Sequence, residues 1–205
     1  DAEEANSDGV NGMSGANSVT LSSNGDHLYM TGENDQAVAF FTRNEATGQL
    51  EFVESHINSS DGVTGLNGVR DIAITPDDKF VYAAGFWDHS IAIFERNSNN
   101  GTLTFSDRFR DNSSVGLNGV SSITISPDGK YLYATGFWEN ALTAFSIAPT
   151  SGALTLIGSQ FRDGVAGIDG LTWANGSTIS PDGKTVYVTS AFDNSVTAFG
   201  VNASD

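Results

Sequence analysis

Four side chains near the middle of the chain could together carry out acid–base chemistry. Arg70 is followed by Asp71, and Asp88 is followed by His89. A carboxylate or an imidazole can activate water, and a guanidinium can hold the negative charge that develops on an attacked carbonyl oxygen. Arg70, Asp71 and His89 are therefore the candidate catalytic residues. The competing interpretation, which we favour because adjacent strand residues point to opposite faces, is that these groups form structural hydrogen bonds or ion pairs.

A second group of residues combines aromatic rings with acids and could bind a ligand. An aromatic ring beside an acid or amide can stack on a sugar face while its neighbour hydrogen-bonds the hydroxyls. The alternative is that one aromatic of each pair packs under the Gly-rich segments 61–68, 115–119 and 163–170. The loops concerned are Phe86-Trp87-Asp88, Phe137-Trp138-Glu139, Phe192-Asp193-Asn194 and the divergent Glu33-Asn34-Asp35. The predicted ligand-binding residues are Phe86, Trp87, Asp88, Phe137, Trp138, Glu139, Phe192 and Asp193.

An internal repeat must position these residues. One pattern recurs at a period of roughly 50 residues: a Pro-Asp-Gly-Lys-type turn, a Tyr, an aromatic or acidic loop, and an alternating strand that ends in Phe. Its Tyr positions are Tyr29, Tyr82, Tyr133 and Tyr187. Such a period built from short alternating strands predicts an all-β fold, a β-propeller of four-stranded antiparallel blades with these tyrosines in the core. The chain is a single array with repeats at approximately 9–61, 62–114, 115–166 and 167–205.

The last repeat is shorter than the others. The pattern predicts a first, second and third strand in every repeat, but a fourth strand in only the first three. Residues 1–6 have poor strand propensity and are not expected to supply the missing strand. Because an open array would leave apolar blade faces bare, we expect either further blades of a longer propeller or self-association, with two copies forming one ring.

Composition narrows the possible partners. The formal net charge is −16, which repels nucleic-acid phosphates and anionic lipid, so we expect neither partner. There is no long apolar run and no signal segment, so we expect no membrane insertion and interpret Asp1 as a mature or excised N-terminus. Cysteine is absent, which excludes disulfides and thiolate metal sites. We expect no cofactor and no metal, with Ca²⁺ as a weak alternative because Asp-Gly turns offer oxygen ligands.

The repeat resembles that of the lactonase-like and YVTN-type β-propellers. The resemblance rests on Val186-Tyr187-Val188-Thr189-Ser190 with Ser180-Pro181-Asp182-Gly183-Lys184, and on the matching Ser126-Pro127-Asp128-Gly129-Lys130 with Tyr131-Leu132-Tyr133. It implies seven-bladed rings for lactonase members and surface proteins for YVTN-type members. These motifs identify a blade rather than an activity, and no residue matches a catalytic motif of the family.

Two functions follow from these observations. We favour an extracellular or cell-surface propeller module that is not an enzyme and that binds carbohydrate or a protein partner through the aromatic and acidic loops, because those loops repeat from blade to blade. The alternative is a lactonase-like hydrolase that acts in the central funnel near Arg70, Asp71 and His89.

Overall fold

The computed structural model of the protein describes residues 9–111 and 115–201, which form four antiparallel β-sheets. This confirms the predicted fold, an all-β propeller array of four-stranded blades. None of the described residues is helical, so no helix that could span a membrane is found there. The first blade contains β1 (Ala16–Leu21), β2 (His27–Gly32), β3 (Ala37–Arg43) and β4 (Leu50–Ile57). The second contains β5 (Val69–Ile74), β6 (Phe80–Gly85), β7 (Ser90–Arg96) and β8 (Leu103–Arg110).

The third and fourth blades depart from this pattern at their outer edge. The third has β9 (Val120–Ile125), β10 (Tyr131–Gly136) and β11 (Ala141–Ile147), and its outer strand is divided into β12 (Leu154–Leu156) and β13 (Phe161–Arg162). Both pieces pair with β11. The fourth has β14 (Ala174–Ile179), β15 (Thr185–Ser190) and β16 (Ser195–Gly200) within the described part. Residues 1–6, which were not expected to complete it, lie outside the described residues.

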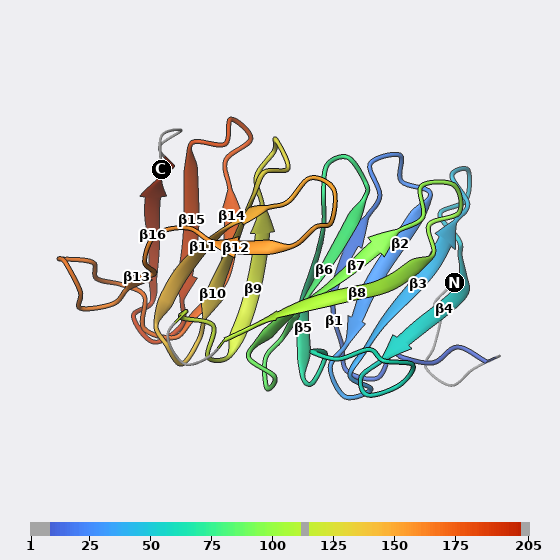
Figure 1. Cartoon of the computed structure of the whole chain (residues 1–205), viewed down its shortest axis with the longest axis horizontal. Helices are drawn as coiled ribbons and strands as arrows, with labels where there is room; N and C mark the ends of the chain where they lie inside the picture. Colours follow the sequence, from blue (N-terminus) through green and yellow to red (C-terminus); the bar gives the residue numbers. More distant parts are fainter. Residues whose placement is uncertain (1–8, 112–114, 202–205) are drawn as a thin grey trace.

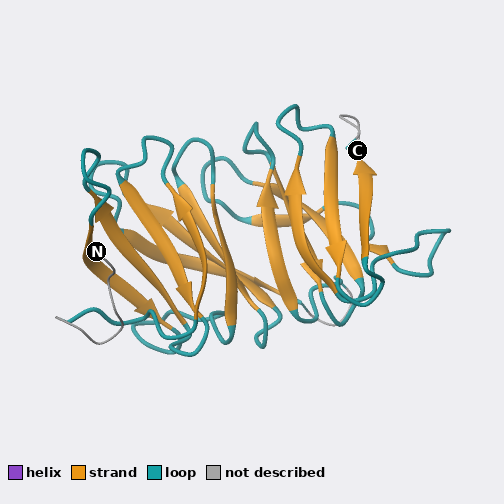
Figure 2. Cartoon of the chain, turned by 180° about the vertical axis from the view of Figure 1, so that it is seen from behind, coloured by secondary structure: helices purple, strands orange, loops and turns teal. Residues whose placement is uncertain are grey.

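The blades stand side by side in sequence order, with the first and the fourth at opposite ends of the array (Figures 1 and 2). Their innermost strands contact one another in the order β1, β5, β9 and β14. The lower edge in Figure 1, where these innermost strands begin, also carries the loops between second and third strands. We call it the first-strand edge. The aromatic and acidic loops therefore lie on the same edge as Arg70.

Tight turns between first and second strands form the opposite edge. In the third blade Ser126 Oγ accepts from the Tyr131 backbone N–H at 2.9 Å and donates to Asp128 at 2.6 Å, while Gly129 has a φ of +71°. Glycine tolerates this left-handed conformation without steric cost, which is what the turn requires. The lysines of the chain, Lys79, Lys130 and Lys184, all lie in these turns.

The repeating tyrosines join neighbouring blades. Tyr29 O–H donates to the Gly101 carbonyl of the second blade at 2.7 Å, and Tyr82 O–H donates to Gly152 of the third at 2.8 Å. Tyr29, Tyr82 and Tyr133 are buried as predicted, but Tyr187 is 40% exposed. Tyr187 lies on the face of the fourth blade that no described blade covers. Valines are bare at both ends of the array, with Val19 65% and Val196 68% exposed.

Candidate active site

The innermost strand of every blade has a β-bulge near its start, at the first-strand edge. In the second blade Val69 pairs with Gly85 and Asp71 pairs with Ala84, which leaves Arg70 as the extra residue. A bulge breaks the alternation of side chains along a strand and re-aims them. Arg70 and Asp71 consequently reach different partners. The equivalent irregularities lie at Ser121 in the third blade and at Asn175 in the fourth.

Arg70 is held between an aromatic ring and a carboxylate. Its guanidinium carbon lies 3.6 Å from the centroid of Phe86, and its Nε and Nη2 both donate to Glu33 Oε1 at 3.1 Å. The side chain of Arg70 is 30% exposed and that of Glu33 is 27% exposed. Since a guanidinium has five N–H donors, further donors remain for a ligand. Arg70 is therefore a pre-positioned, partly exposed cation at this edge.

The Asp71 carboxylate forms hydrogen bonds to the blades on either side. Its Oδ1 accepts from Ser18 Oγ in the first blade at 2.8 Å and from its neighbour Ile72 N at 2.9 Å. Its Oδ2 accepts from Ser122 Oγ at 2.9 Å and from Ile123 N at 2.8 Å, both in the third blade. The carboxylate thus links three blades near the axis. With four donors on its two oxygens, Asp71 has little capacity left to bind or deprotonate water.

His89 lies towards the third blade. Its Nδ1 accepts from the Gly119 backbone N–H at 3.0 Å, and its ring centroid is 6.1 Å from that of Trp138. In a neutral imidazole with Nδ1 as acceptor, Nε2 carries the proton and acts as a donor. Among the described residues no hydrogen bond or ion pair joins His89 to Arg70 or Asp71. The three candidate catalytic residues share an edge but do not form one hydrogen-bonded group.

Three acids of these loops bind neighbouring segments, two through backbone N–H groups and one through an arginine. Asp88 Oδ2 accepts from Asn67 N at 3.0 Å, and Asp193 Oδ2 accepts from Thr172 N at 2.7 Å. Glu139, at the same loop position, forms an ion pair with Arg162 of β13 at 2.6 Å. Each bond anchors a loop to a neighbouring segment. These contacts favour positioning roles for the three acids that were predicted to bind ligand.

The aromatic residues form one continuous row along this edge. Phe86 is buried, whereas Trp87 is 51% and Trp138 41% exposed. One aromatic of the second-blade pair therefore packs inside and its partner faces solvent, as the sequence allowed. The row runs by ring contacts through Trp87–Trp138 at 5.1 Å, Phe86–Trp138 at 4.6 Å, Phe86–Phe137 at 5.9 Å, Phe137–Trp173 at 5.5 Å and Trp173–Phe192 at 5.0 Å.

Two residues of this edge were not predicted as site residues. Glu33 occupies the loop position at which the next two blades carry Phe86 and Phe137, and Trp173 occupies the position of Gly68 and Gly119. Both substitutions are visible when the repeats are aligned, since Leu171-Thr172-Trp173-Ala174 stands against Leu66-Asn67-Gly68-Val69. What the sequence did not show is that Glu33 contacts Arg70.

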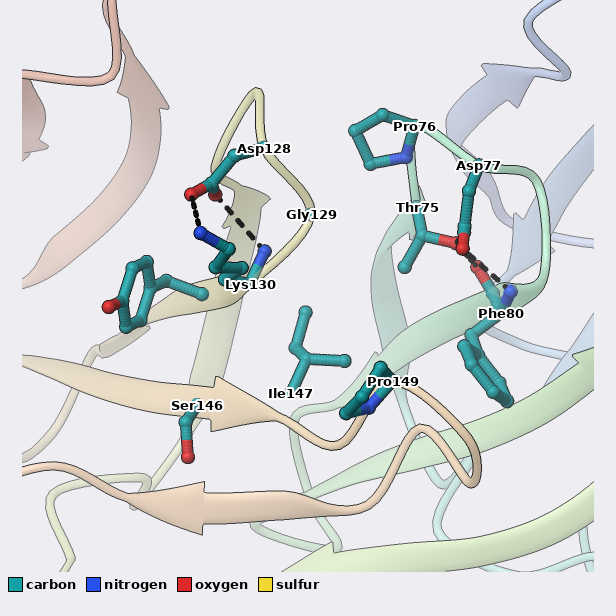
Figure 3. A pocket seen from close by; sticks show the side chains of 11 residues that line it. Thr75, Pro76, Asp77, Phe80, Asp128, Gly129, Lys130, Ser146, Ile147 and Pro149 are labelled. Atoms are coloured by element: carbon teal, nitrogen blue, oxygen red, sulfur yellow. Dashed lines mark hydrogen bonds and ion pairs between the residues drawn. The ribbon is translucent and has the colours of Figure 1, made fainter.

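Two hollows of the described residues lie away from the first-strand edge. One, of about 630 Å³, lies between the turns of the second and third blades, with Phe80, Ile147 and Pro149 in its wall (Figure 3). The acids beside it are occupied, because Asp77 accepts from Thr75 Oγ1 at 2.7 Å and pairs with Lys79 at 2.9 Å. The other, of about 640 Å³, lies between the third and fourth blades beside Tyr133 and Phe199. Lys130 beside the first hollow is paired with Asp128 at 3.5 Å, and no tryptophan lines either hollow.

Within residues 9–111 and 115–201 no group of three or more His, Asp or Glu side chains could hold a metal ion. The acids of the first-strand edge are instead engaged with backbone N–H groups and arginines. The geometry that this edge offers is a cation beside an apolar platform.

Comparisons with known proteins identify the family of the chain. The family model described as "Lactonase, 7-bladed beta-propeller" matches residues 4–113 and 107–166. A Lactococcus lactis protein, YwcC, of uncharacterised function is 31% identical over 102 residues, which are 47% of this chain and 29% of YwcC. A 6-phosphogluconolactonase of Klebsiella pneumoniae is 24% identical over 154 residues, covering 74% of this chain and 45% of that protein.

Solved structures show the same fold. The periplasmic gluconolactonase PpgL of Pseudomonas aeruginosa superposes with a TM-score of 0.70 at 22% identity, over 92% of this chain and 50% of PpgL. This chain thus spans about half the length, or less, of these relatives. The interpretation as a surface-associated binding module is wrong, because the matching family model is that of the lactonases and two of the curated relatives are named 6-phosphogluconolactonase. The chain belongs to the lactonase family of 7-bladed beta-propellers.

Proposed function

We propose that this protein hydrolyses the lactone ring of a sugar acid at its first-strand edge. The observation that carries the proposal is Arg70, whose guanidinium is fixed by Phe86 at 3.6 Å and by Glu33 at 3.1 Å and, among the described residues, keeps further donors free. Family membership and relatives named 6-phosphogluconolactonase and gluconolactonase support it. Because the chain spans about half of those relatives, the activity is proposed for the whole protein to which these blades belong.

Lactone hydrolysis needs few protein groups, and residues of the first-strand edge can supply them. Water adds to the lactone carbonyl carbon, the bond from that carbon to the ring oxygen breaks, and the ring oxygen takes a proton to give an open-chain hydroxy acid. Arg70 can donate to the carbonyl oxygen as it becomes negative. Trp87 and Trp138 offer exposed ring faces for the C–H face of the sugar.

Glu33 is our candidate for activating the water. Its Oε1 is held by Arg70, while its Oε2 accepts from Asn17 Nδ2 at 3.0 Å and retains a further lone pair. His89 Nδ1 accepts from Gly119 N, so its Nε2–H can donate a hydrogen bond to the departing ring oxygen, which takes up the proton that Glu33 removed from water. The expectations of an extracellular location, of self-association or further blades, and of no cofactor stay predictions.

Proton release from D-glucono-1,5-lactone and from its 6-phosphate ester, followed with a pH indicator, tests the proposal. We expect hydrolysis above the buffer rate with at least one of the two, and a loss of about 10²–10³-fold in kcat for Arg70→Gln, since one oxyanion donor is removed. Arg43→Lys is the control, because Arg43 Nη1 donates to Gly25 O at 3.2 Å on the opposite edge. Hydrolysis no faster than buffer, or full activity in Arg70→Gln, would overturn it.

A further inference from the structure

The residue before the innermost strand is glycine in three blades and tryptophan in the fourth. Gly15, Gly68 and Gly119 have φ values of +72°, +63° and +70°, and Trp173 has +58°. A bulky L-residue is sterically disfavoured in this left-handed region, whereas glycine is not. The other three blades follow the same backbone path with glycine at this position, so the fold does not require a tryptophan there.

The glycines of the second and third blades lie beneath tryptophans of the loop between second and third strands. A Cβ at Gly119 would come within 3.0 Å of Trp138, and one at Gly68 would overlap Trp87. The fourth blade reverses this arrangement. Ala191 stands at the position of Phe86, and the indole comes from the glycine position itself, where Trp173 stacks on Phe137 with an interplanar angle of 18°. The aromatic row is continued across the fourth blade through a strained backbone.

A second glycine is replaced close by. Gly85 and Gly136 approach the carbonyls of Gly65 and Gly116 so closely that a Cβ could not be accommodated, yet the fourth blade has Ser190 at this position. Ser190 is 3% exposed, and its Oγ has no hydrogen-bond partner among the described residues. It is the Cα partner of Ala174, directly after Trp173. An unpartnered buried hydroxyl lowers stability, so two unfavourable features coincide at one end of this blade.

Strain that the fold does not require is typical of functional sites, where it positions a group that binds. We infer that Trp173 is a substrate-positioning residue whose indole contacts the apolar face of the bound sugar-acid lactone. This inference rests on the proposed function. Trp173 is 44% exposed and Phe192, which it contacts at 5.0 Å, is 61% exposed, so both rings are accessible to a ligand from solvent.

Three variants of one residue separate strain from binding. Trp173→Ala removes the ring and keeps a Cβ in the left-handed region, Trp173→Gly removes both, and Trp173→Phe keeps a ring. By thermal unfolding we expect the Gly variant to melt about 2–4 °C above the Ala variant, which reverses the usual order of these residues. For D-glucono-1,5-lactone we expect KM to rise about 2- to 10-fold in both, with kcat within about twofold of wild type and the Phe variant near wild type.

Binding can be followed independently of turnover. The chain has three tryptophans, Trp87, Trp138 and Trp173, and all lie in the aromatic row, so intrinsic fluorescence titrated with D-gluconate, the hydrolysis product, reports on this edge. Ala166→Gly is the matched control. Ala166 is exposed, has a φ of +54° and lies in the same link, so its replacement relieves similar strain without removing a ring and leaves KM unchanged.

If the wild-type protein is active and Trp173→Ala and Trp173→Gly have the same KM as wild type, Trp173 does not position the substrate. Equal melting temperatures of the Ala and Gly variants would show that the backbone at residue 173 is not strained, and the inference would then lose its basis. A wild type that neither hydrolyses the lactone nor responds to D-gluconate would instead overturn the proposed function, and this inference with it.

Discussion

Arg70 of the second blade holds Glu33 of the first blade through two hydrogen bonds of 3.1 Å to a single carboxylate oxygen. Glu33 stands where the next two blades carry Phe86 and Phe137, so the aromatic row ends at this ion pair. The first-strand edge therefore carries an ion pair at the boundary of the first and second blades and a row of aromatic rings beyond it. Such a surface suits a sugar lactone, which has a polar carbonyl and an apolar C–H face.

Glu33→Gln distinguishes a base from a support for Arg70. The amide oxygen can still accept from Arg70, but it cannot take a proton from water. We expect kcat for lactone hydrolysis to fall about 10²-fold, with KM and the melting temperature close to those of wild type. If the variant keeps full activity, Glu33 only positions Arg70.

Asp71→Asn should act on stability. The Nδ2 group of asparagine would face Ser122 Oγ and Ile123 N, which donate to the aspartate at 2.9 and 2.8 Å. The Ser122 hydroxyl can turn to accept from this amide, but Ile123 N–H would lose its acceptor, so we expect a loss of about 2–4 kcal/mol in the free energy of unfolding, measured with urea. Asp107→Asn on the exposed side of β8 is the control and should cost less than about 0.5 kcal/mol. A stable but inactive Asp71→Asn variant would indicate a catalytic role instead.

Tyr29→Phe should cost more stability than Tyr82→Phe. Both hydroxyls donate to a glycine carbonyl, but that of Tyr29 also accepts from Arg96 Nε at 2.6 Å. Burial raises the pKa of Tyr29 to about 12, so the hydroxyl keeps its proton at neutral pH. We expect losses of about 1 kcal/mol for Tyr82→Phe and about 2–3 kcal/mol for Tyr29→Phe, where the buried Arg96 loses an acceptor. Equal losses in urea unfolding would mean that Arg96 finds another partner.

Ser126→Ala should raise the pKa of Asp128. The hydrogen bond from Ser126 Oγ, helped by Lys130, holds that pKa below its ordinary value against the effect of burial. A carboxyl whose pKa is lowered by folding stabilises the protein above the unfolded pKa, and this contribution is lost as pH falls through the folded pKa. The variant should therefore lose less stability in acid than wild type. Carboxyl NMR titration measures the shift, with Asp182, held by Ser180 at 2.6 Å, as an internal reference; an unchanged Asp128 would contradict it.

The sequence by itself determined the blades and their edges. Apolar alternation around Tyr29, Tyr82 and Tyr133 predicted strands that pack on both faces, because a period of two is a local property of the chain. The Pro-Asp-Gly-Lys turns predicted which loops share an edge for the same reason. The function was inferred wrongly, since these motifs report how blades pack and carry no information about the chemistry at their edge.

Only the tertiary structure decided which partner each side chain has. The bulge at Arg70 and the approach of the first blade bring Glu33 to it across 37 residues of sequence, while Asp71 reaches Ser18 and Ser122 in the blades on either side. The stacking of Trp173 on Phe137 likewise arises from packing between the third and fourth blades. Contacts between blades depend on bulges and relative placement, which local patterning does not encode.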